Sequence, residues 1–395
     1  VAFEDLYQEG IQIATHNDLT DEDQSIHYAE IGTTAVDTNT NDNVGTTGKT
    51  TIKDTVAYKN LIVGQEYTVV GTLMDKATGK EFGSSPIKAT TTFTAESTEG
   101  TVDLIYSVDS SELDEKTLVV FEDLMVNGIV VISHSDIDDE GQTIHFPKIV
   151  TQAKTNEGLQ ETLVGNTVTV TDVVSYTNLV VGKEYTVKGK LMNKETGEEL
   201  LVNGAPITQE VTFIPDNSRG SVNLDFIVDT SALEGNTIVV FEDLYHNAIK
   251  VATHSSLTDT AQSIRVPKLT TTALDGKTSD HEGLAENEMT FVDTLSYTNL
   301  EVNAKYSIVG KLVDKDTGEL IKDGTYSGTF TPGSENGSTA VTFNFDGEAL
   351  KGKTIVALEE IYRDEKLIAK HSDVTDTNQM VSYPKIETQA VGKES

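Results

Sequence analysis

Apolar and polar residues alternate along most of the chain with a period of two. The run from Tyr67 through Val69 and Gly71 to Leu73 has this pattern, and similar runs rich in Val, Ile, Thr and Tyr recur throughout. Such alternation predicts β-strands with one buried face. Segments such as Thr-Gly-Lys, Val-Gly-Gln and Val-Asn-Gly interrupt the runs at short intervals, as turns do. The only helix that we expect is a turn near 110–113.

The strand pattern belongs to larger repeats. A block that reads VAFEDLY from Val1 returns in related form at Val119, Val239 and Val356, at steps of 118, 120 and 117 residues. A second block, DTVAYKNLIVGQEY from Asp54, has two diverged copies further along the chain. About seven short strands in a repeat of this size are typical of one sandwich domain. The sequence therefore predicts an all-β fold of tandem immunoglobulin-like β-sandwich domains.

The junctions between repeats are short. Ala29, Pro147, Pro267 and Pro384 stand where the last strand of one copy gives way to the first strand of the next, with no Gly/Ser linker. Proline has a fixed φ and no N–H, so it ends a strand ladder and stiffens the connection. We expect the domains to form a rod. The predicted limits are 1–29 for an incomplete repeat, 30–147, 148–267 and 268–384 for complete domains, and 385–395 for the first strand of another repeat.

Composition narrows the function. The formal net charge of −35 argues against nucleic acid or an anionic membrane as a partner. Because the chain has no cysteine, neither a disulfide nor a thiolate nucleophile is available. No apolar run approaches the length of a membrane span, and any targeting segment is expected to lie outside this sequence.

Five polar residues keep a fixed spacing in every repeat. A Glu precedes a His by twelve residues, the His precedes an Asp by five, the Asp precedes a Gln by three, and the Gln precedes a Thr by nine. The four sets are Glu4, His16, Asp21, Gln24 and Thr33; Glu122, His134, Asp139, Gln142 and Thr151; Glu242, His254, Asp259, Gln262 and Thr271; and Glu359, His371, Asp376, Gln379 and Thr388. A further Asp follows three of the Thr residues by 21 or 22 positions, at Asp54, Asp172 and Asp293. Retention of ancestral residues would explain any one position, but here the polar set is fixed while its neighbours vary.

These residue types are suited to one reaction. A Thr hydroxyl becomes a nucleophile when a base such as His takes its proton, and the Gln carboxamide would be its target. Two carboxyl groups held together in an apolar interior cannot both ionise, so one keeps a proton and can stabilise the developing oxyanion. Attack would expel ammonia and leave a Thr–Gln ester. The Asp that follows the His would orient the imidazole.

The turn at 126–128 decides whether Glu and His meet. A three-residue loop with a bulge at Gly128 would place Glu122 opposite His134 on one face. A two-residue Asn-Gly turn would place them on opposite faces. The sequence leaves both alternatives open.

The Val-Ala-Phe-Glu block, the Asp-x-[Val/Leu]-x-Tyr-x-Asn-Leu strand and the His-x4-Asp-x2-Gln motif resemble the ester-bond (Thr-Gln, or VaFE-repeat) domains of Gram-positive surface adhesins. In that family an immunoglobulin-like domain forms an autocatalytic ester between a first-strand Thr and a last-strand Gln, assisted by a buried Asp–Glu pair and a His. The resemblance implies the links Thr33–Gln142, Thr151–Gln262 and Thr271–Gln379, and the acid pairs Asp54–Glu122, Asp172–Glu242 and Asp293–Glu359. The third repeat departs from the motif, with Leu358-Glu359-Glu360 in place of Phe-Glu-Asp.

Three other interpretations compete with this one. A plain stalk would use the motif only for packing. Lysine-to-asparagine isopeptide chemistry fits worse, because no Lys repeats at the Thr position and the last strand is expected to begin with Gln. Asp37, Asn39, Asn41 and Asp42 resemble a calcium loop, but the other repeats lack this spacing, which favours a solvated turn.

We therefore expect a self-cross-linked stalk of an extracellular, cell-surface or cell-wall-anchored adhesin or filament, with no cofactor and no metal. A multiple-turnover enzyme is not expected, because the reactive groups would consume each other once. Any host or surface ligand is expected to bind outside this sequence. Head-to-tail association of molecules through Thr388 and Gln24 is possible in principle, although the incomplete repeat lacks its Asp.

Overall fold

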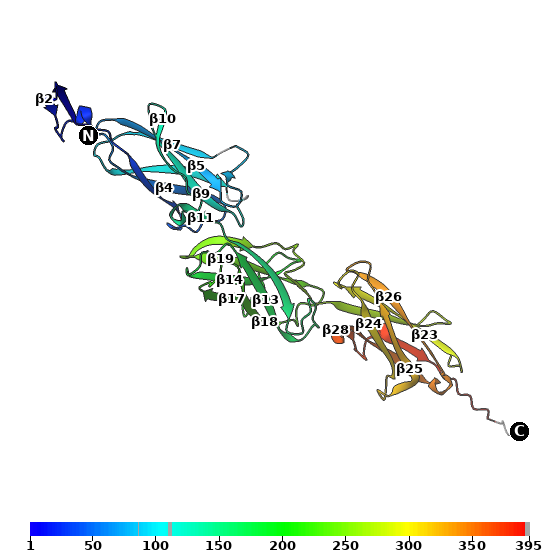
Figure 1. Ribbon diagram of the computed structural model, residues 1–395. Coiled ribbons are helices and arrows are strands. Elements are labelled where there is room, and N and C mark those ends of the chain that lie inside the picture. Colours follow the sequence, from blue (N-terminus) through cyan, green and yellow to red (C-terminus); the bar gives the residue numbers. More distant parts are fainter. Residues whose placement is uncertain (86, 110–112, 392–395) are drawn as a thin grey trace.

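The computed structural model describes residues 1–85, 87–109 and 113–391, which form three β-sandwich bodies arranged end to end (Figure 1). The chain termini lie at opposite ends of the rod. In each body a three-stranded sheet faces a sheet of five or six strands. This confirms the predicted all-β architecture of tandem immunoglobulin-like sandwiches.

The first domain contains β3 to β11. Its small sheet has the order β3 (Glu30–Asp37), β4 (Lys49–Lys59), β8 (Gly100–Asp109). Its large sheet has the order β10 (Ile129–His134), β9 (Thr117–Val126), β5 (Glu66–Asp75), β6 (Lys80–Glu81), with β7 (Lys88–Thr94) on β5 and β11 (Thr143–His145) on β9.

The second and third domains repeat this plan. The second has β12 (Lys148–Thr155), β13 (Thr167–Thr177), β18 (Gly220–Asp229) opposite β17 (Thr208–Phe213), β14 (Tyr185–Asn193), β19 (Thr237–His246), β20 (Ile249–His254), with β21 (Ser263–Arg265) on β19 and a small ribbon of β15 (Leu201–Val202) and β16 (Ala205–Pro206). The third has β22 (Lys268–Asp275), β23 (Met289–Thr298), β26 (Gly337–Phe345) opposite β25 (Leu320–Phe330), β24 (Tyr306–Asp314), β27 (Lys353–Arg363), β28 (Lys366–His371), with β29 (Met380–Tyr383) on β27.

Short 3-10 turns, rather than one helical turn, accompany the strands. They are η1 (Glu22–Gln24), η3 (Glu140–Gln142), η4 (Glu348–Leu350) and η5 (Thr377–Gln379). The expectation of a single helix is therefore wrong, and most of the turn predicted near 110–113 lies outside the described residues. Three of these turns end on a Gln of the repeated set. The Gln side chains thus come from a turn just before the last strand, and not from the strand itself.

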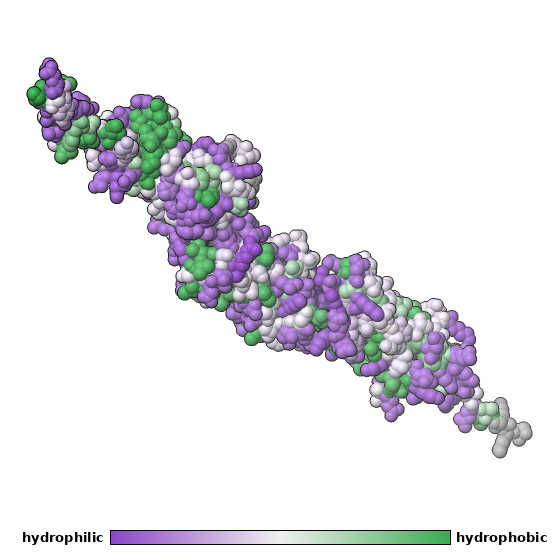
Figure 2. All heavy atoms as spheres, in the orientation of Figure 1, coloured by the Kyte–Doolittle hydropathy of each residue, from purple (hydrophilic) through white to green (hydrophobic). Residues whose placement is uncertain are grey.

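The alternating residues fill the space between the sheets. Ile52 and Val56 of β4 and Val69 and Leu73 of β5 are fully buried in the core of the first domain. The other two domains have cores of their own. Hydrophilic residues cover much of the visible surface (Figure 2), and no described helix has the length and apolar character needed to cross a membrane.

An asparagine from each following domain holds the joint to the domain before it. Asn178, which follows β13, donates from Nδ2 to the carbonyl oxygens of Lys116 (2.7 Å) and Phe146 (3.0 Å). Its Oδ1 accepts from Thr117 Oγ1 at 3.0 Å. Asn299 makes the same type of contacts at the second joint, with Nδ2 2.7 Å from the Asn236 carbonyl oxygen. Both asparagines have a positive φ, which Asn tolerates better than most residues.

The β3–β4 loop also crosses the first joint. Val44 is packed in the core cluster of the second domain, and the Asp42 carboxylate pairs with Lys183 and with His246 Nε2, the latter at 3.1 Å. Asp37 is fully buried and accepts from Thr46 and Thr50. The predicted solvated turn is therefore only partly right. Asn39 and Asn41 are exposed, but Asp37 orders the loop from a buried position and Asp42 docks it on the next domain. In the described part of the chain, no cluster of three or more His, Cys, Asp or Glu could hold a metal ion.

Candidate functional site

The two sheets bring each Thr close to its expected Gln. Thr151 lies on β12, and its Oγ1 accepts a hydrogen bond of 2.7 Å from Gln262 Nε2. In the third domain, Thr271 Oγ1 lies 2.5 Å from Gln379 Nε2. Both Gln side chains are fully buried. A hydroxyl and a carboxamide thus meet in an interior position between the first strand and the turn before the last strand.

In the first domain the same groups meet through the acid. Thr33 Oγ1 donates to Glu122 Oε2 at 3.4 Å, and Gln142 Nε2 lies 2.8 Å from each oxygen of that carboxyl group. Gln142 is fully buried, whereas Thr33 is partly exposed. The first site therefore has the same residues, but its Thr makes a longer hydrogen bond and is more exposed.

A buried carboxyl pair lies beside each Thr and Gln. Asp172 on β13 and Glu242 on β19 come from opposite sheets, are at most 2% exposed and lie close enough for each to shift the pKa of the other. Burial, followed by the charge of Asp172, raises the pKa of Glu242 to about 10. Burial also raises the pKa of Asp172, to about 6, against the effect of the neighbouring Glu242. At neutral pH such a pair retains a proton.

The other two pairs have the same electrostatics. Burial and the charge of Asp54 raise the pKa of Glu122 to about 9. Burial and the charge of Asp293 raise the pKa of Glu359 to about 11. A proton held by these groups at neutral pH is available for a hydrogen bond to an oxyanion.

The five-residue spacing of His and Asp, which recurs in every repeat, places the two side chains in direct contact. His254 Nε2 lies 2.8 Å from Asp259 Oδ2, and the other Asp oxygen accepts from the backbone N–H of Ala261 at 2.8 Å. One carboxylate thus joins the His-bearing strand to the turn that carries Gln262. The equivalent His–Asp distances are 2.9 Å for His134 and Asp139, 3.0 Å for His371 and Asp376, and 2.6 Å for His16 and Asp21.

In the third domain the His ring turns its second nitrogen toward the strand of the Thr, because His371 Nδ1 lies 3.3 Å from the carbonyl oxygen of Leu269, two residues before Thr271. Since a carboxylate can only accept, Nε2 carries the hydrogen of the contact with Asp. A carbonyl oxygen also only accepts, so Nδ1 must lose the Leu269 contact and be without a proton before it can act as a base. Within the described residues, no direct hydrogen bond joins a His of this set to its Thr hydroxyl.

The register of the hairpin resolves the alternative left open by the sequence. The loop between β9 and β10 is the two-residue turn Asn127-Gly128, and yet Glu122 pairs directly with His134. Val131 is an extra residue between the paired positions, and this bulge restores the common face. The expectation that a two-residue turn would separate the two side chains is therefore wrong.

The incomplete repeat keeps only part of the site. β1 (Glu4–Gln8) and β2 (Ile11–His16) form an exposed hairpin in which Glu4 pairs with His16. Thr388 lies in the exposed segment after β29, at the other end of the rod from Gln24. The structure thus does not bring Gln24 and Thr388 together within one molecule.

Sequence reasoning did not single out a glycine that faces each acidic Glu. Gly71 pairs with Glu122, Gly189 with Glu242, and Gly310 with Glu359 across neighbouring strands. The signal was present, because a Gly inside an otherwise regular strand often marks close approach of another group. The joint asparagines were likewise visible as the repeated Asn-Leu after each Tyr, without an assigned role.

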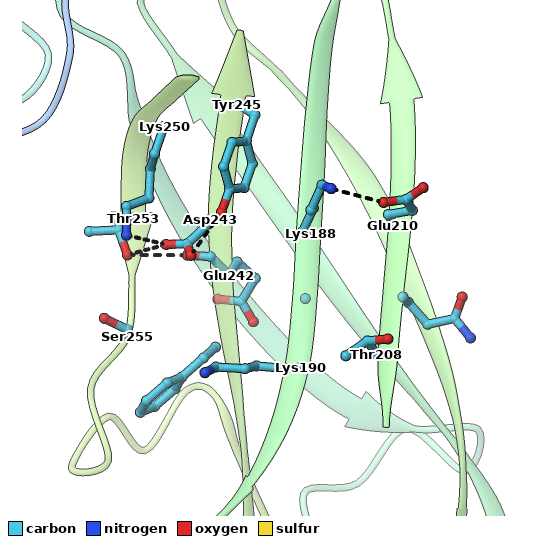
Figure 3. A pocket seen from close by; sticks show the side chains of 13 residues that line it. Lys188, Lys190, Thr208, Glu210, Glu242, Asp243, Tyr245, Lys250, Thr253 and Ser255 are labelled. Atoms are coloured by element: carbon cyan, nitrogen blue, oxygen red, sulfur yellow. Dashed lines mark hydrogen bonds and ion pairs between the residues drawn. The ribbon is translucent and has the colours of Figure 1, made fainter. Parts of the chain in front are cut away.

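A pocket of about 740 Å³ lies on the outer face of the large sheet of the second domain (Figure 3). Two ion pairs lie within it, with Lys188 3.4 Å from Glu210 and Lys250 3.4 Å from Asp243, while Lys190 pairs with Glu199 outside the pocket. Glu242 borders this pocket but is almost completely buried among the cross-link residues. The pocket is therefore a polar surface behind the candidate site.

The fold and the site define a class of β-sandwich domain in which a buried Thr, Gln and acid pair lie between the first and last strands. The chain belongs to the T-Q ester bond containing domain family, which matches residues 1–28, 29–146, 147–266 and 267–383. Among curated proteins, no relative matches the chain.

Several solved structures are distantly similar to the chain. Two crystal forms of a Mobiluncus mulieris adhesin containing intramolecular disulfide, isopeptide and ester bond cross-links are each 18% identical and cover 63% of this chain and 88% of that chain, with TM-scores of 0.28 and 0.27. A glycosyl hydrolase family 2 member from Bacteroides cellulosilyticus is 9% identical over 51% of this chain and 26% of that chain, with a TM-score of 0.24.

Proposed function

We propose that each complete domain forms one intramolecular Thr–Gln ester, Thr33–Gln142, Thr151–Gln262 and Thr271–Gln379, without an added enzyme or cofactor. The observation that carries the proposal is the 2.7 Å contact between Thr151 Oγ1 and the buried Gln262 amide beside a protonated acid pair. In the reaction the Thr Oγ–Cδ bond forms and the Gln Cδ–Nε2 bond breaks. The Thr proton leaves with the nitrogen as ammonia, so the atoms balance.

In this proposal the His is the base. His254 Nδ1 takes the proton from Thr151 Oγ1 as it attacks and returns it to the departing nitrogen. Asp259 keeps the ring in the tautomer with a free Nδ1 and keeps the turn of Gln262 in place. The same roles apply to His134 with Asp139 and to His371 with Asp376.

The acid pair serves the amide oxygen. In the structure Glu242 lies 2.5 Å from Gln262 Nε2, while Gln262 Oε1 is buried and has no hydrogen-bond partner among the described residues. A half-turn of the amide about its Cγ–Cδ bond would bring Oε1 to the protonated carboxyl, which could then donate to the developing oxyanion. We propose this rotamer as the reactive one, and Asp172–Glu242 as its hydrogen-bond donor.

The function of the ester would be mechanical. Each link would enclose 108 to 111 residues, a loop that could otherwise extend by roughly 350 Å at about 3.3 Å per residue. By analogy with a disulfide that closes a similar loop, the chain-entropy gain is about 4 to 5 kcal/mol per domain. Tension would pass from Thr to Gln through the ester, so the core would remain folded.

We infer that the protein is a stalk of an extracellular surface adhesin or filament that binds its ligand elsewhere. The rod of similar domains, the family and the strong negative charge support this interpretation. The domain limits 30–147, 148–267 and 268–384, and any association between molecules through the ends, remain predictions. Single turnover is part of the proposal, because each ester consumes its own Thr and Gln.

The test is the intact mass of the purified chain. We expect a deficit of three ammonias from the mass of the sequence, with one regained in each of Thr33→Ala, Thr151→Ala and Thr271→Ala. Peptide mapping should find the three linked pairs. A mass equal to that of the unmodified sequence would refute the ester and leave an uncross-linked stalk.

A further inference from the structure

Each acidic Glu has a glycine beside it on the neighbouring strand. Gly71 on β5 is in register with Glu122, and the same pairing joins Gly189 to Glu242. Directly paired residues on neighbouring antiparallel strands point to the same face, with Cβ positions about 5 Å apart. The space that a side chain at Gly71 would occupy is therefore next to the side chain of Glu122.

An aromatic ring from the opposite sheet occupies this space. A Cβ on Gly71 would lie 1.8 Å from Tyr106 Oη and 2.6 Å from Leu104 Cδ1, both on β8. Leu104 in turn is paired with Asp54, the second acid. The glycine thus lets the two sheets approach closely at the carboxyl pair and surrounds the pair with apolar groups.

The aromatic residue differs between domains. The position of Tyr106 is occupied by Phe226 in the second domain and by Phe343 in the third, whose Cζ atoms would lie 2.8 Å and 2.7 Å from a Cβ on the respective glycine. The first site therefore contains a phenol hydroxyl where the other two contain only a ring edge.

The Tyr106 hydroxyl is buried without a partner. The residue is 1% exposed, and its Oη has no hydrogen-bond partner among the described residues. Burial and the charges of Asp54 and Glu122 raise the pKa of Tyr106, so the phenol keeps its proton and can only help an anion by donating.

We propose that Tyr106 is a positioning residue of the first site, whose hydroxyl donates a hydrogen bond to the Asp54–Glu122 pair as the ester forms. This inference rests on the proposed ester chemistry. A donor to the ionised pair stabilises its charged form, so the pair in the first domain should release its proton at lower pH than the pairs beside Phe226 and Phe343. Ester formation needs that proton. As pH is raised, the rate of ester formation in the first domain should therefore begin to decline at a lower pH than the rates in the other two domains.

The experiment follows the three links separately in the full chain. The chain is kept unfolded in denaturant, refolded by dilution into buffers from neutral to alkaline pH, and quenched at intervals. Mass spectrometry of the linked peptides then gives one rate for each domain at each pH. We expect the alkaline decline for Thr33–Gln142 to lie about one pH unit below the decline for Thr151–Gln262, a tenfold difference in proton occupancy.

Two reciprocal variants decide the matter. Tyr106→Phe should move the decline of the first domain up to that of the second, and Phe226→Tyr should move the decline of the second domain down. Tyr67→Phe is the matched control, because Tyr67 is a buried tyrosine of the first domain whose Oη accepts from Ile62 N at 3.0 Å. This control should leave all three profiles unchanged.

The failures are distinguishable. If Tyr106→Phe or Phe226→Tyr leaves its pH profile unchanged while the other domains link normally, the role of Tyr106 is overturned and the ester proposal stands. If no domain forms a linked peptide in the unaltered chain, the ester proposal itself fails. Should Tyr106→Phe prevent folding of the first domain, Phe226→Tyr still tests the effect of the hydroxyl in the second.

Discussion

Glu122 and His134 stand directly opposite each other on β9 and β10, although twelve residues and a two-residue turn separate them. A regular two-residue hairpin would pair Glu122 with the residue before His134. The bulge at Val131 adds the one residue that returns His134 to the face of the cross-link groups. The fixed spacing of twelve residues therefore reflects the register of this hairpin, and the equivalent Glu and His are paired in the same way in the other repeats.

Insertion of one Ala after Val131 should abolish the ester of the first domain alone. The bulge already takes up one extra residue, so a second one shifts the strand and turns His134 to the other face of the sheet. The intact mass should then show a deficit of two ammonias in place of three. Val131→Ala, which keeps the bulge and removes only an exposed side chain, is the control and should retain all three. A full deficit in the insertion variant would contradict the importance of this register.

Replacement of the acid should slow the reaction strongly. Glu242→Met keeps the approximate size of the side chain but has no N–H or O–H to donate, and loss of an oxyanion donor typically costs about 100-fold or more in rate. The rate of Thr151–Gln262 link formation after refolding measures the effect. The links of the first and third domains serve as controls in the same molecule, and an unchanged rate in the second domain would exclude the acid pair from the chemistry.

His254→Ala should slow the second link by about 100-fold to 10,000-fold, the usual contribution of a general base. Asp259→Asn should have a smaller effect, because the imidazole remains but its orientation is lost. Comparison of the two rates in the same refolding assay tests the roles assigned to His254 and Asp259. A larger loss with Asp259→Asn than with His254→Ala would indicate that the Asp acts mainly by holding the turn of Gln262.

The acid pairs should also affect stability before linkage. Because burial raises the pKa of Glu242 above its unfolded value, the folded state binds more protons between the two values, and stability falls as pH rises through this window. In a Thr151→Ala background the second domain should therefore lose stability from pH 5 to pH 8 relative to a Thr151→Ala/Glu242→Gln chain. We expect the melting temperatures to diverge by about 5 °C, measured by calorimetry. Parallel melting curves across this range would contradict a protonated pair.

Asn178→Ala should loosen the first joint without affecting the esters. The substitution removes hydrogen bonds to Lys116 and Phe146 and leaves their carbonyl groups to water. The intact mass should be unchanged, while small-angle scattering should report a broader distribution of domain orientations. Asn223→Ala, on β18 of the same domain, is the control for a general effect of losing an asparagine. An unchanged scattering profile in Asn178→Ala would mean that the loop around Val44 fixes the joint by itself.

Much of the fold could be predicted because the chain repeats itself. The alternation around Tyr67 to Leu73 and the recurrence of VAFEDLY are local signals, and each copy supports the assignment made in the others. The site residues could be identified for the same reason, since the equivalents of Thr151 and Gln262 occupy fixed positions in every repeat. These local signals do not predict how the strands pack against one another in space. A bulge such as that at Val131 has no special residue to mark it, because its cause is the packing of the whole hairpin.

The loops and joints were less predictable. Asp42 belongs to a polar segment that looks solvated in sequence, but its partners Lys183 and His246 are about 140 and 200 residues away. The role of Gly71 depends on Tyr106, which comes from the opposite sheet. Such contacts depend on how sheets and domains meet, and no local periodicity records them.

The joint asparagines also give the rod a direction. At both joints the asparagine belongs to the following domain, and the carbonyl groups that it contacts belong to the preceding domain. The two sides of the contact are therefore different surfaces. A contact between unlike surfaces repeats along a screw axis and does not close on itself, unlike the contact of a symmetric dimer. Copies can therefore be added or removed without a change to any remaining joint. The number of domains in such a molecule can therefore change while the asparagine contact and the contacts around it keep each remaining step the same.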